Sequence, residues 1–493
     1  MAGKSKAAAN AAGVPDYQQE FSKRTIKNYI ASFLAPIGFQ GLSAMLFSTY
    51  LVYVYTEYLG VGAAAISTVV SVGVIVDAIT DFLMGMITDR VITKWGKAKH
   101  WFLIMAFPIG ISMALMWMVP ATAGSTMKLV YAFIVYNVFC TLLTATRVPG
   151  AAIPALVTDS TKIRGNMGWM SQIAMAVGAS AVGWIVTPML DAQGESLATY
   201  RLISIVCAAI ATACLFVTGI LLTEQRDKAE WMEVRKDYAK MHNDKHESMG
   251  AQIVNLFKNR YYIQYLIINA VQGMGIFFVF GVLAYWLKFV EGDMSKMAIV
   301  FTALNIPNIL GTLGFAIPNR FLKPKQIMLL TVGGQMIFGY LMWIFGAKYF
   351  TLMIIALCIK TVFGGMSTPM GGIWIPMVID YGEWKTGSRQ EGLCNAGGTV
   401  ISKIVTAIAT ASVGFILAAN GYSGGGSITQ QGINAINFLF FGVPAISVTI
   451  GFVLWLFWDL TPEKMDKYRA EVKERKEAAR AERVAADAPE EKE

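Results

Sequence analysis

Long apolar runs separated by short polar stretches recur along the whole chain. Each run has about 20 residues or more, the length that an α-helix needs to cross the hydrocarbon core of a bilayer. We count about twelve such runs from hydropathy and from the polar loops between them. The predicted spans cover residues 27–57, 63–88, 101–120, 127–153, 168–190, 200–222, 259–290, 295–318, 326–346, 349–379, 392–419 and 432–458. This pattern predicts an all-α polytopic membrane protein embedded in a lipid bilayer.

Two polar tails and one charged linker divide the chain. Residues 1–24 are basic and alanine-rich and lack an apolar core, so we expect a tail and not a signal peptide. The linker, residues 223–258, separates two halves of six spans each, residues 25–222 and 259–459. Residues 460–493 are rich in Ala, Glu, Lys and Arg, which predicts a solvated helix. Similar charged loops follow spans 4 and 10, and such pseudo-symmetric halves are typical of alternating-access transporters.

Composition narrows the class further. Only 15% of the 493 residues are charged, whereas soluble proteins carry about 25%. The basic residues behind the net charge of +9 cluster in loops, so we attribute them to topology and not to nucleic acid. This distribution predicts a cell-membrane protein with both termini in the cytoplasm. The five cysteines lack a CxxC spacing and only three histidines occur, so we expect no disulfide, metal centre or cofactor. No obligate protein partner is evident from the sequence.

Asp77 and Asp81 interrupt one of the apolar runs, between residues 63 and 86. On a helix, positions i and i+4 share a face, with Cβ atoms about 6 Å apart. Each carboxylate costs about 2.5 kcal/mol or more within a membrane. Two like charges this close also resist joint ionisation unless a cation lies between them. The pair therefore predicts a site for a transported cation; the alternative is a structural pair satisfied by hydroxyls and one basic side chain.

Two loop motifs carry a family resemblance. GMITDR at Gly85–Arg90, followed by TKWGKAKHW, resembles the loop 2–3 signature of the major facilitator superfamily. Its WGK form, and DYGEWKTGSRQEG at Asp380–Gly392, resemble the glycoside–pentoside–hexuronide:cation symporters, the melibiose permease group. Asp77 and Asp81 match the paired aspartates of that group. The resemblance runs through almost all of the chain except the tails and implies the major facilitator fold, with twelve helices in two pseudo-symmetric halves.

The resemblance also implies roles for single residues. Asp77 and Asp81 fall where the family binds its coupling cation, and Thr144 falls where the melibiose permease has a threonine near that cation. Thr80 replaces an asparagine and keeps a side-chain oxygen, whereas Lys403 matches a lysine close to the carboxylate pair. Because Na⁺ is a hard ion that prefers oxygen ligands, Thr80 and Thr144 favour Na⁺. A proton could bind the same dyad, so Na⁺ and H⁺ stay open as alternatives.

Two departures from the family bear on the substrate. Gly41 and Arg147 stand where the melibiose permease has two acidic sugar-binding residues, so galactoside recognition by that pair is not expected. Arg147, Lys360 and Lys403 outnumber the two carboxylates, and this excess predicts an anionic substrate, such as a hexuronide or a sulfonated sugar, held by Arg147. Alternatively, Arg147 pairs with a protein acid or caps a helix break near Pro149. Lys360 would then snorkel, and Lys403 would neutralise the dyad. The predicted substrate-binding residues are Gly41, Arg147, Lys360, Trp374 and Thr399.

A second set of charges lies in the loops after spans 2, 4 and 10. An acid–base pattern recurs there in both halves, which predicts a cytoplasmic gate of ion pairs that form and break as the halves move. The alternative is a set of solvated loop charges worth less than about 1 kcal/mol per pair. The predicted gate residues are Asp89, Arg90, Asp159, Arg164, Asp380, Glu383, Arg389 and Glu391.

Together these features predict a secondary active transporter and not an enzyme. We expect import of a sugar, glycoside or sugar acid by symport with Na⁺ or H⁺, through alternating access. The alternatives are a carrier of lysolipids or other small solutes with the same fold, a non-transporting sensor, and a membrane enzyme. The sequence offers no membrane-embedded His/Cys cluster, nucleophile–base pair or nucleotide loop, which disfavours the enzyme.

Overall fold

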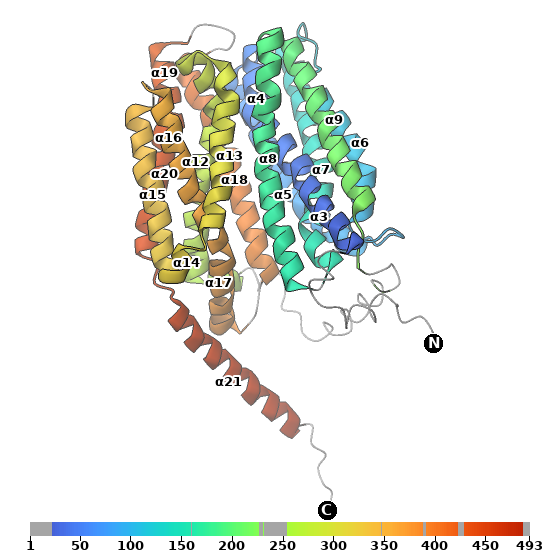
Figure 1. The fold of residues 1–493 in the computed structure, drawn as a ribbon, viewed down its shortest axis with the longest axis vertical. Helices are drawn as coiled ribbons and strands as arrows, with labels where there is room; N and C mark the ends of the chain where they lie inside the picture. The colour runs from blue at the N-terminus through green and yellow to red at the C-terminus, as the bar shows by residue number, and fades with distance from the viewer. Residues whose placement is uncertain are drawn as a thin grey trace, which may run out of the picture.

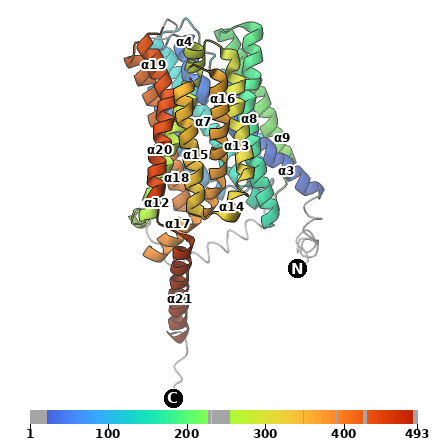
Figure 2. The same ribbon diagram turned by 60° about the vertical axis from the view of Figure 1, so that its left-hand side comes forward.

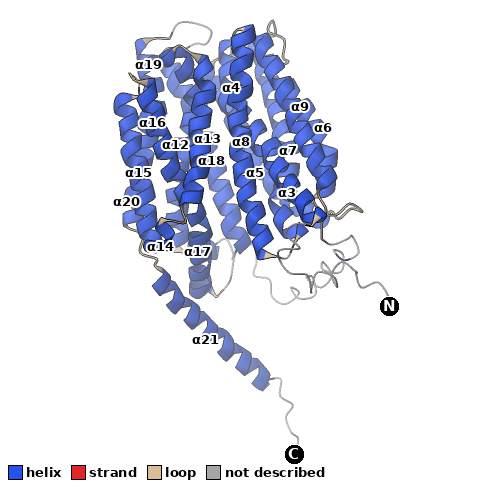
Figure 3. Ribbon diagram, viewed as in Figure 1, coloured by secondary structure: helices blue, strands red, loops and turns tan. Residues whose placement is uncertain are grey.

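The computed structural model describes residues 22–158, 160–225, 230, 254–346, 348–387, 391–422 and 428–486. Within this part of the chain the regular secondary structure is helical, apart from one isolated bridge between Thr93 and Gly96 (Figure 3). The all-α prediction is therefore confirmed. The helices before residue 460 pack side by side as one bundle (Figure 1).

The first predicted spans form six helical stretches. The first stretch runs from α3 (Lys23–Pro36) through the π-helical segment η1 (Ile37–Leu42) into α4 (Ser43–Glu57). The others are α5 (Ala63–Arg90), α6 (Lys99–Leu115), α7 (Ser125–Val157), α8 (Thr161–Gln193) and α9 (Leu197–Leu221).

The later spans follow the same plan with more breaks. Their helices are α12 (Arg260–Trp286) with η2 (Leu287–Glu291), η3 (Met294–Lys296) with α13 (Met297–Gly314), α14 (Pro318–Phe321), α15 (Pro324–Phe345), α16 (Phe350–Ser367) with η4 (Thr368–Met370) and α17 (Gly371–Thr386), α18 (Glu391–Ala419), and α19 (Gln430–Asn437) with η5 (Phe438–Gly442) and α20 (Val443–Leu456). A final helix, α21 (Pro462–Ala486), corresponds to the helix expected from the composition of the C-terminal tail.

The predicted spans match these helices closely. Eleven helical stretches of the described chain are long and apolar enough to cross a membrane. The third predicted span is the shorter apolar helix α6, which has 17 residues. Large apolar side chains, among them Ile79, Phe107, Ile111 and Phe415, are exposed on the bundle. Such a surface is unfavourable in water and suits lipid, so the bundle is that of a multi-pass membrane protein.

Three helix pairs join the first six spans to the last six. α5 packs along α18, α8 along α13, and α4 along α12. α8 and α13 lie next to each other in both views (Figures 1 and 2). The start of α3 and the projecting helix α21 lie at the same end of the bundle, which we call the terminal end. The opposite end, where α4 finishes, we call the far end.

Glycines allow close backbone contacts inside both halves. A Cβ at Gly41 in η1 would lie 2.8 Å from the Cα of Gly178 and 2.8 Å from the carbonyl oxygen of Met175 in α8. In the second half, a Cβ at Gly311 of α13 would collide with the carbonyl of Val362 in α16. Small residues at such crossings let membrane helices approach closely, since packing is a main source of their association.

The WGK motif after the second span also has a structural explanation. Gly96 has a φ of +107°, and a Cβ there would collide with the carboxylate of Glu224. That carboxylate accepts backbone hydrogen bonds from Lys97 at 2.9 Å, Ala98 at 2.7 Å and Lys99 at 3.2 Å. A negative group is favourable at a helix N-terminus, so Glu224 stabilises the start of α6. The motif thus joins the loop to the beginning of the linker.

We predict that Gly41→Ala destabilises the bundle. The new methyl group would press on the backbone of α8, and overpacking of this kind costs about 1–3 kcal/mol. The measurement is the thermal unfolding midpoint of the purified protein in detergent. Gly168→Ala on α8 is the control, because a Cβ there meets nothing within 4 Å. Equal midpoints for the two variants would contradict the prediction.

Candidate functional site

Three helices bring charged residues of the spans together. α5 carries Asp77 and Asp81, which lie one turn apart on one face of the helix. α7 carries Thr144 and Arg147, three residues apart, and α18 carries Lys403. Because α5 packs against both α7 and α18, the five side chains converge. We call Asp77, Asp81, Thr144, Arg147 and Lys403 the ion cluster.

The hydroxyl of Thr144 lies between the two carboxylates. Its Oγ1 is 3.0 Å from Oδ1 of Asp77 and 2.7 Å from Oδ1 of Asp81, and the residue is buried. Since a hydroxyl has one proton, Thr144 donates to one carboxylate at a time. The same oxygen accepts a hydrogen bond from Nη2 of Arg147 at 3.4 Å. The hydroxyl therefore links both acids and the guanidinium into one polar network.

Two cationic side chains neutralise the dyad. Arg147 pairs with both oxygens of Asp81, and its Nη2 lies 3.7 Å from Oδ2 of Asp77. Lys403 pairs with Asp77, and its Nζ lies 3.4 Å from Oδ2 of Asp81. Only 10% of the Asp77 side chain and 13% of the Asp81 side chain remain exposed. Two negative and two positive groups thus compensate one another where an isolated charge would be costly.

The ion cluster connects the two halves of the bundle. Asp77, Asp81 and Arg147 belong to the first six spans, whereas Lys403 belongs to the last six. Lys403 is therefore the member that carries an ion pair across the boundary between α5 and α18.

Two members of the predicted site lie differently from the expectation. Thr80, expected beside the cation, donates its hydroxyl proton to the backbone oxygen of Asp77 at 3.0 Å. Arg147, expected to hold an anionic substrate, pairs instead with Asp81, in line with the alternative interpretation of this residue. Lys403 lies against the dyad, where both the resemblance and the alternative interpretation place it. The roles of these residues in cation and substrate binding stay predictions.

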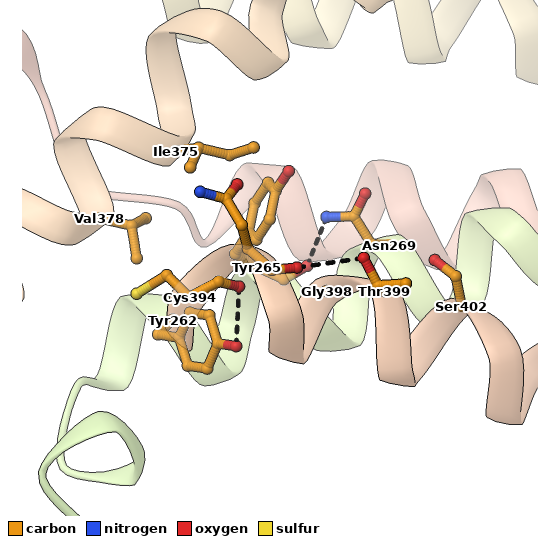
Figure 4. Close-up of a pocket in the computed structure, with 10 residues that line it drawn as sticks. Tyr262, Tyr265, Asn269, Ile375, Val378, Cys394, Gly398, Thr399 and Ser402 are labelled. Atoms are coloured by element: carbon orange, nitrogen blue, oxygen red, sulfur yellow. Dashed lines mark hydrogen bonds between the residues drawn. The ribbon is translucent and has the colours of Figure 1, made fainter. Parts of the chain in front are cut away.

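A cavity of about 250 Å³ lies among α12, α17 and α18 (Figure 4). Its wall reaches Ser402, the neighbour of Lys403. Thr399 lines it, one turn before Lys403, and donates its hydroxyl proton to the backbone oxygen of Asn395 at 3.3 Å. The wall offers aromatic rings, amides and hydroxyls, which are the groups that bind sugars. These groups come from Tyr262, Tyr265, Asn269, Asn395, Thr399 and Ser402.

The remaining predicted substrate residues lie elsewhere. Gly41 lies in the contact between η1 and α8. Lys360 lines a second cavity of about 300 Å³ within the last six spans, and its amine has no hydrogen bond or ion pair with the described residues. Trp374 is buried, with ring centroids 5.3 Å from Trp455 and 5.3 Å from Trp458. No hydrogen bond or ion pair within the described chain joins these residues to the ion cluster.

Of the predicted gate residues, the structure describes Arg164, Asp380 and Glu383, which lie at the terminal end. Asp380 pairs with Arg469 of α21 at 2.7 Å, and Glu383 is buried. Arg164 donates from Nε to the backbone oxygen of Thr158 at 2.7 Å. The residues Asp159 and Arg389, and the side chains of Asp89, Arg90 and Glu391, lie outside the described residues.

A second charged cluster, which sequence reasoning missed, joins the halves at the far end. Nζ of Lys288, in η2, lies 3.0 Å from Oε2 of Glu57 and 3.5 Å from Oε2 of Glu195. Tyr422, which follows α18, donates a hydrogen bond to Glu57. Tyr58 donates to Glu195 at 2.9 Å. We call Glu57, Glu195, Lys288, Tyr58 and Tyr422 the far-end cluster.

Tyrosine rings enclose the cation of the far-end cluster. Nζ of Lys288 lies 5.4 Å from the ring centroid of Tyr53 and 5.2 Å from that of Tyr58, so cation–π attraction adds to the ion pairs. The hydroxyl groups of Tyr285 and Thr56 lie 2.8 Å apart across the same boundary. Only 4% of the Glu57 side chain is exposed. In this conformation the two halves are therefore held together at the far end.

One signal in the sequence could have identified this cluster. Glu57 ends the first span, and Lys288 lies near the end of the seventh, so opposite charges stand at matching positions of the two halves. In a repeat protein of this type, the corresponding ends of corresponding spans meet across the pseudo-symmetry axis.

Comparison with known proteins identifies a family of transporters that agrees with the loop motifs of the sequence. The sequence profile of the family described as MFS/sugar transport protein matches residues 32–462. The chain is 25% identical over 437 residues to the isoprimeverose transporter of Lactiplantibacillus pentosus, covering 86% of each chain. It is 24% identical over 466 residues to the glucuronide carrier protein homolog of Escherichia coli (strain K12), covering 93% of this chain and 97% of the relative.

The chain is also similar to a putative glycoside/cation symporter and, in fold, to a transporter of known structure. The putative glycoside/cation symporter YagG of Escherichia coli (strain K12) is 26% identical over 424 residues, covering 84% of this chain and 88% of the relative. The xylose transporter XylE from E. coli, in a partially occluded inward-open conformation, has a TM-score of 0.62 and 12% identity. That match covers 89% of this chain and 98% of XylE, and it concerns the fold alone.

The bundle and its buried ion cluster define a membrane transporter of the major facilitator fold. The chain belongs to the MFS/sugar transport protein family, of the glycoside–pentoside–hexuronide:cation symporter type, as its two loop motifs predicted. It is accordingly a transporter and not an enzyme.

We predict that Lys403→Met lowers the free energy of unfolding by up to about 3–5 kcal/mol, because it leaves buried carboxylate charge without its partner. The double variant Asp77→Asn/Lys403→Met removes both charges and should recover part of that loss. Chemical unfolding in detergent measures both effects. Lys348→Met, at an exposed position, serves as the control. A double variant less stable than the Lys403 variant would contradict a neutralising role for this lysine.

Proposed function

We propose that the chain imports a sugar, a glycoside or a sugar acid together with a cation, Na⁺ or H⁺, by alternating access. The observation that carries this proposal is the ion pair between the carboxylate dyad of the first half and Lys403 of the second half. A cation that binds the dyad changes the charge on one side of this contact. Cation binding is thereby linked to the relative position of the halves.

The relatives support a sugar-like substrate. Their names include an isoprimeverose transporter, a glucuronide carrier homolog and a putative glycoside/cation symporter. The cavity that Thr399 and Ser402 line offers suitable chemistry, since Tyr265 presents a ring (Figure 4). Asn395 and Thr399 supply polar groups to the same wall. A sugar in this cavity would lie within one helical turn of the ion cluster along α18. The two ligands can then influence each other through Lys403, and such coupling is reciprocal.

The cation site in this proposal consists of the groups around the dyad. Asp77, Asp81 and Thr144 offer oxygen atoms to Na⁺, or the carboxylates accept a proton. Among the residues that the structure describes, no group of three or more His, Cys, Asp or Glu side chains could hold a metal ion.

Alternating access requires contacts that open at one end while others close at the other. The far-end cluster supplies the closed contact of the present conformation. In the opposite conformation, the charges at the terminal end, including Arg164, Asp380 and Glu383, would close that end. The positively charged loops favour a cytoplasmic position for the terminal end in a cell membrane, so the far-end cluster is the external gate in this proposal.

We predict that Asp81→Asn folds but loses cation-stimulated uptake. The substitution keeps the side-chain shape and removes one of the two charges that attract the cation. Uptake of labelled sugars into proteoliposomes, at varied Na⁺ and pH, measures the effect. Asp466→Asn on the exposed face of α21 should transport like the unmodified protein. Full Na⁺ or H⁺ stimulation in the Asp81 variant would exclude this carboxylate from coupling.

A second prediction concerns the external gate. In a background with the native cysteines replaced, Glu57→Cys/Lys288→Cys should be cross-linked by a short thiol-reactive reagent or by oxidation. Because the linked halves cannot separate at the far end, uptake should stop, and reduction of a disulfide should restore it. The single variant Glu57→Cys controls for effects of the reagent. Undiminished uptake by a fully cross-linked protein would rule out the gate.

A further inference from the structure

The guanidinium group of Arg147 occupies the place that the sequence assigned to a transported cation. It contacts both oxygens of Asp81, lies 3.7 Å from Oδ2 of Asp77, and lies 3.4 Å from Oγ1 of Thr144. These are the oxygen atoms expected to surround the coupling ion. A cation that enters this site therefore competes with a positive group that the chain itself supplies.

From this geometry we infer that Arg147 is a tethered counterpart of the coupling cation, and that it leaves Asp81 for a substrate with one negative charge. The departure of the guanidinium frees the carboxylate for Na⁺ or H⁺. This inference rests on the proposed function and names both the substrate class and the residue that couples the two ligands.

The balance of charges selects an anionic substrate. Asp77 and Asp81 contribute two negative charges, and Arg147 and Lys403 contribute two positive charges, so the ion cluster is neutral as it stands. A bound Na⁺ or H⁺ leaves one positive charge in excess in a poorly solvated place, which is unfavourable. One negative charge on the substrate restores neutrality. A neutral sugar offers no such compensation.

Arg147 is the member of the ion cluster best placed to exchange partners. Its side chain is 30% exposed, whereas that of Lys403 is 14% exposed. Arg147 and the dyad also belong to the same half, so its departure breaks no ion pair between the halves. Lys403 keeps that connection. A guanidinium can bind carboxylate, sulfonate or phosphate oxygens through two parallel hydrogen bonds, which a lysine cannot do.

The exchange has a consequence for binding in the absence of substrate. While Arg147 occupies the dyad, only a small fraction of the molecules offers a free cation site, and the apparent cation affinity falls by that fraction. An anionic sugar should raise the apparent affinity for the cation. By linkage, the cation should raise the affinity for the sugar by the same factor.

The test measures ligand binding by the full-length protein in lipid nanodiscs. Na⁺ is titrated by calorimetry and by thermal stabilisation, with and without glucuronate or 6-deoxy-6-sulfoglucose, and with glucose as the neutral control. The two anions each carry one negative charge and distinguish a carboxylate from a sulfonate. If the cation is H⁺, the charged sugar should instead cause uptake of up to about one proton per protein molecule, which a pH dye detects in weak buffer.

The variant Arg147→Gln separates the inference from a structural role. It should bind Na⁺, or take up a proton, without any sugar, with an apparent cation affinity at least about tenfold higher than that of the unmodified protein. It should also lose the stabilisation by the charged sugar. Arg320→Gln, at an exposed position at the terminal end, should behave like the unmodified protein.

Two results of the binding measurements would overturn the inference. One is an unchanged cation response in Arg147→Gln. The other needs no variant: no charged sugar changes the affinity of the unmodified protein for Na⁺ or H⁺. Failure of the proposed function has a different signature, because the unmodified protein would then transport sugars with no dependence on any cation. Cation-dependent uptake of neutral sugars alone would contradict only the inference.

Discussion

Compensation of charge inside an apolar bundle is the constraint on which the rest of this structure depends. Asp77 and Asp81 lie in a membrane-spanning helix, where an uncompensated carboxylate is unfavourable. Thr144 supplies a hydroxyl, and Arg147 and Lys403 supply the opposite charges. The partners come from three helices and from both halves. The helices that pack together at the boundary therefore also carry the groups that make the dyad tolerable there.

Buried charges are also compensated at the far end, by a different set of side chains. Lys288 lies between two carboxylates and two tyrosine rings, and its partner Glu57 is almost completely buried. Both clusters join the first six spans to the last six. The ion cluster lies in the middle of α5 and α18, and the far-end cluster lies where α4 finishes. Separation of the two halves at the far end would break the ion pairs of Lys288 with Glu57 and Glu195.

The chain keeps the fold and the carboxylate dyad of its family but differs from the melibiose permease group in a charged side chain beside the dyad. The chain resembles the melibiose permease group at the dyad, at Thr144 and at Lys403. It differs at Arg147, where that group has an acid. An acid at this position would add to the negative charge around the cation. Arg147 instead neutralises part of that charge by pairing with Asp81. The change is in the sign of one side chain on an unchanged helix. This change of charge is the basis for proposing an anionic substrate, and it requires no difference in fold.

The sequence alone determined the helical class, the approximate positions of the spans and the family, because apolar runs and loop motifs are local features that need no knowledge of packing. It also identified the dyad, since acids within an apolar run stand out. It could not decide whether Arg147 faces a substrate or Asp81, nor that Gly41 is in a helix contact. The pairing of Glu57 with Lys288 was also missed. All three contacts depend on which helices meet. Only the tertiary structure brings together side chains that are separated by hundreds of residues, and the resulting electrostatic partners decide the chemistry of the site.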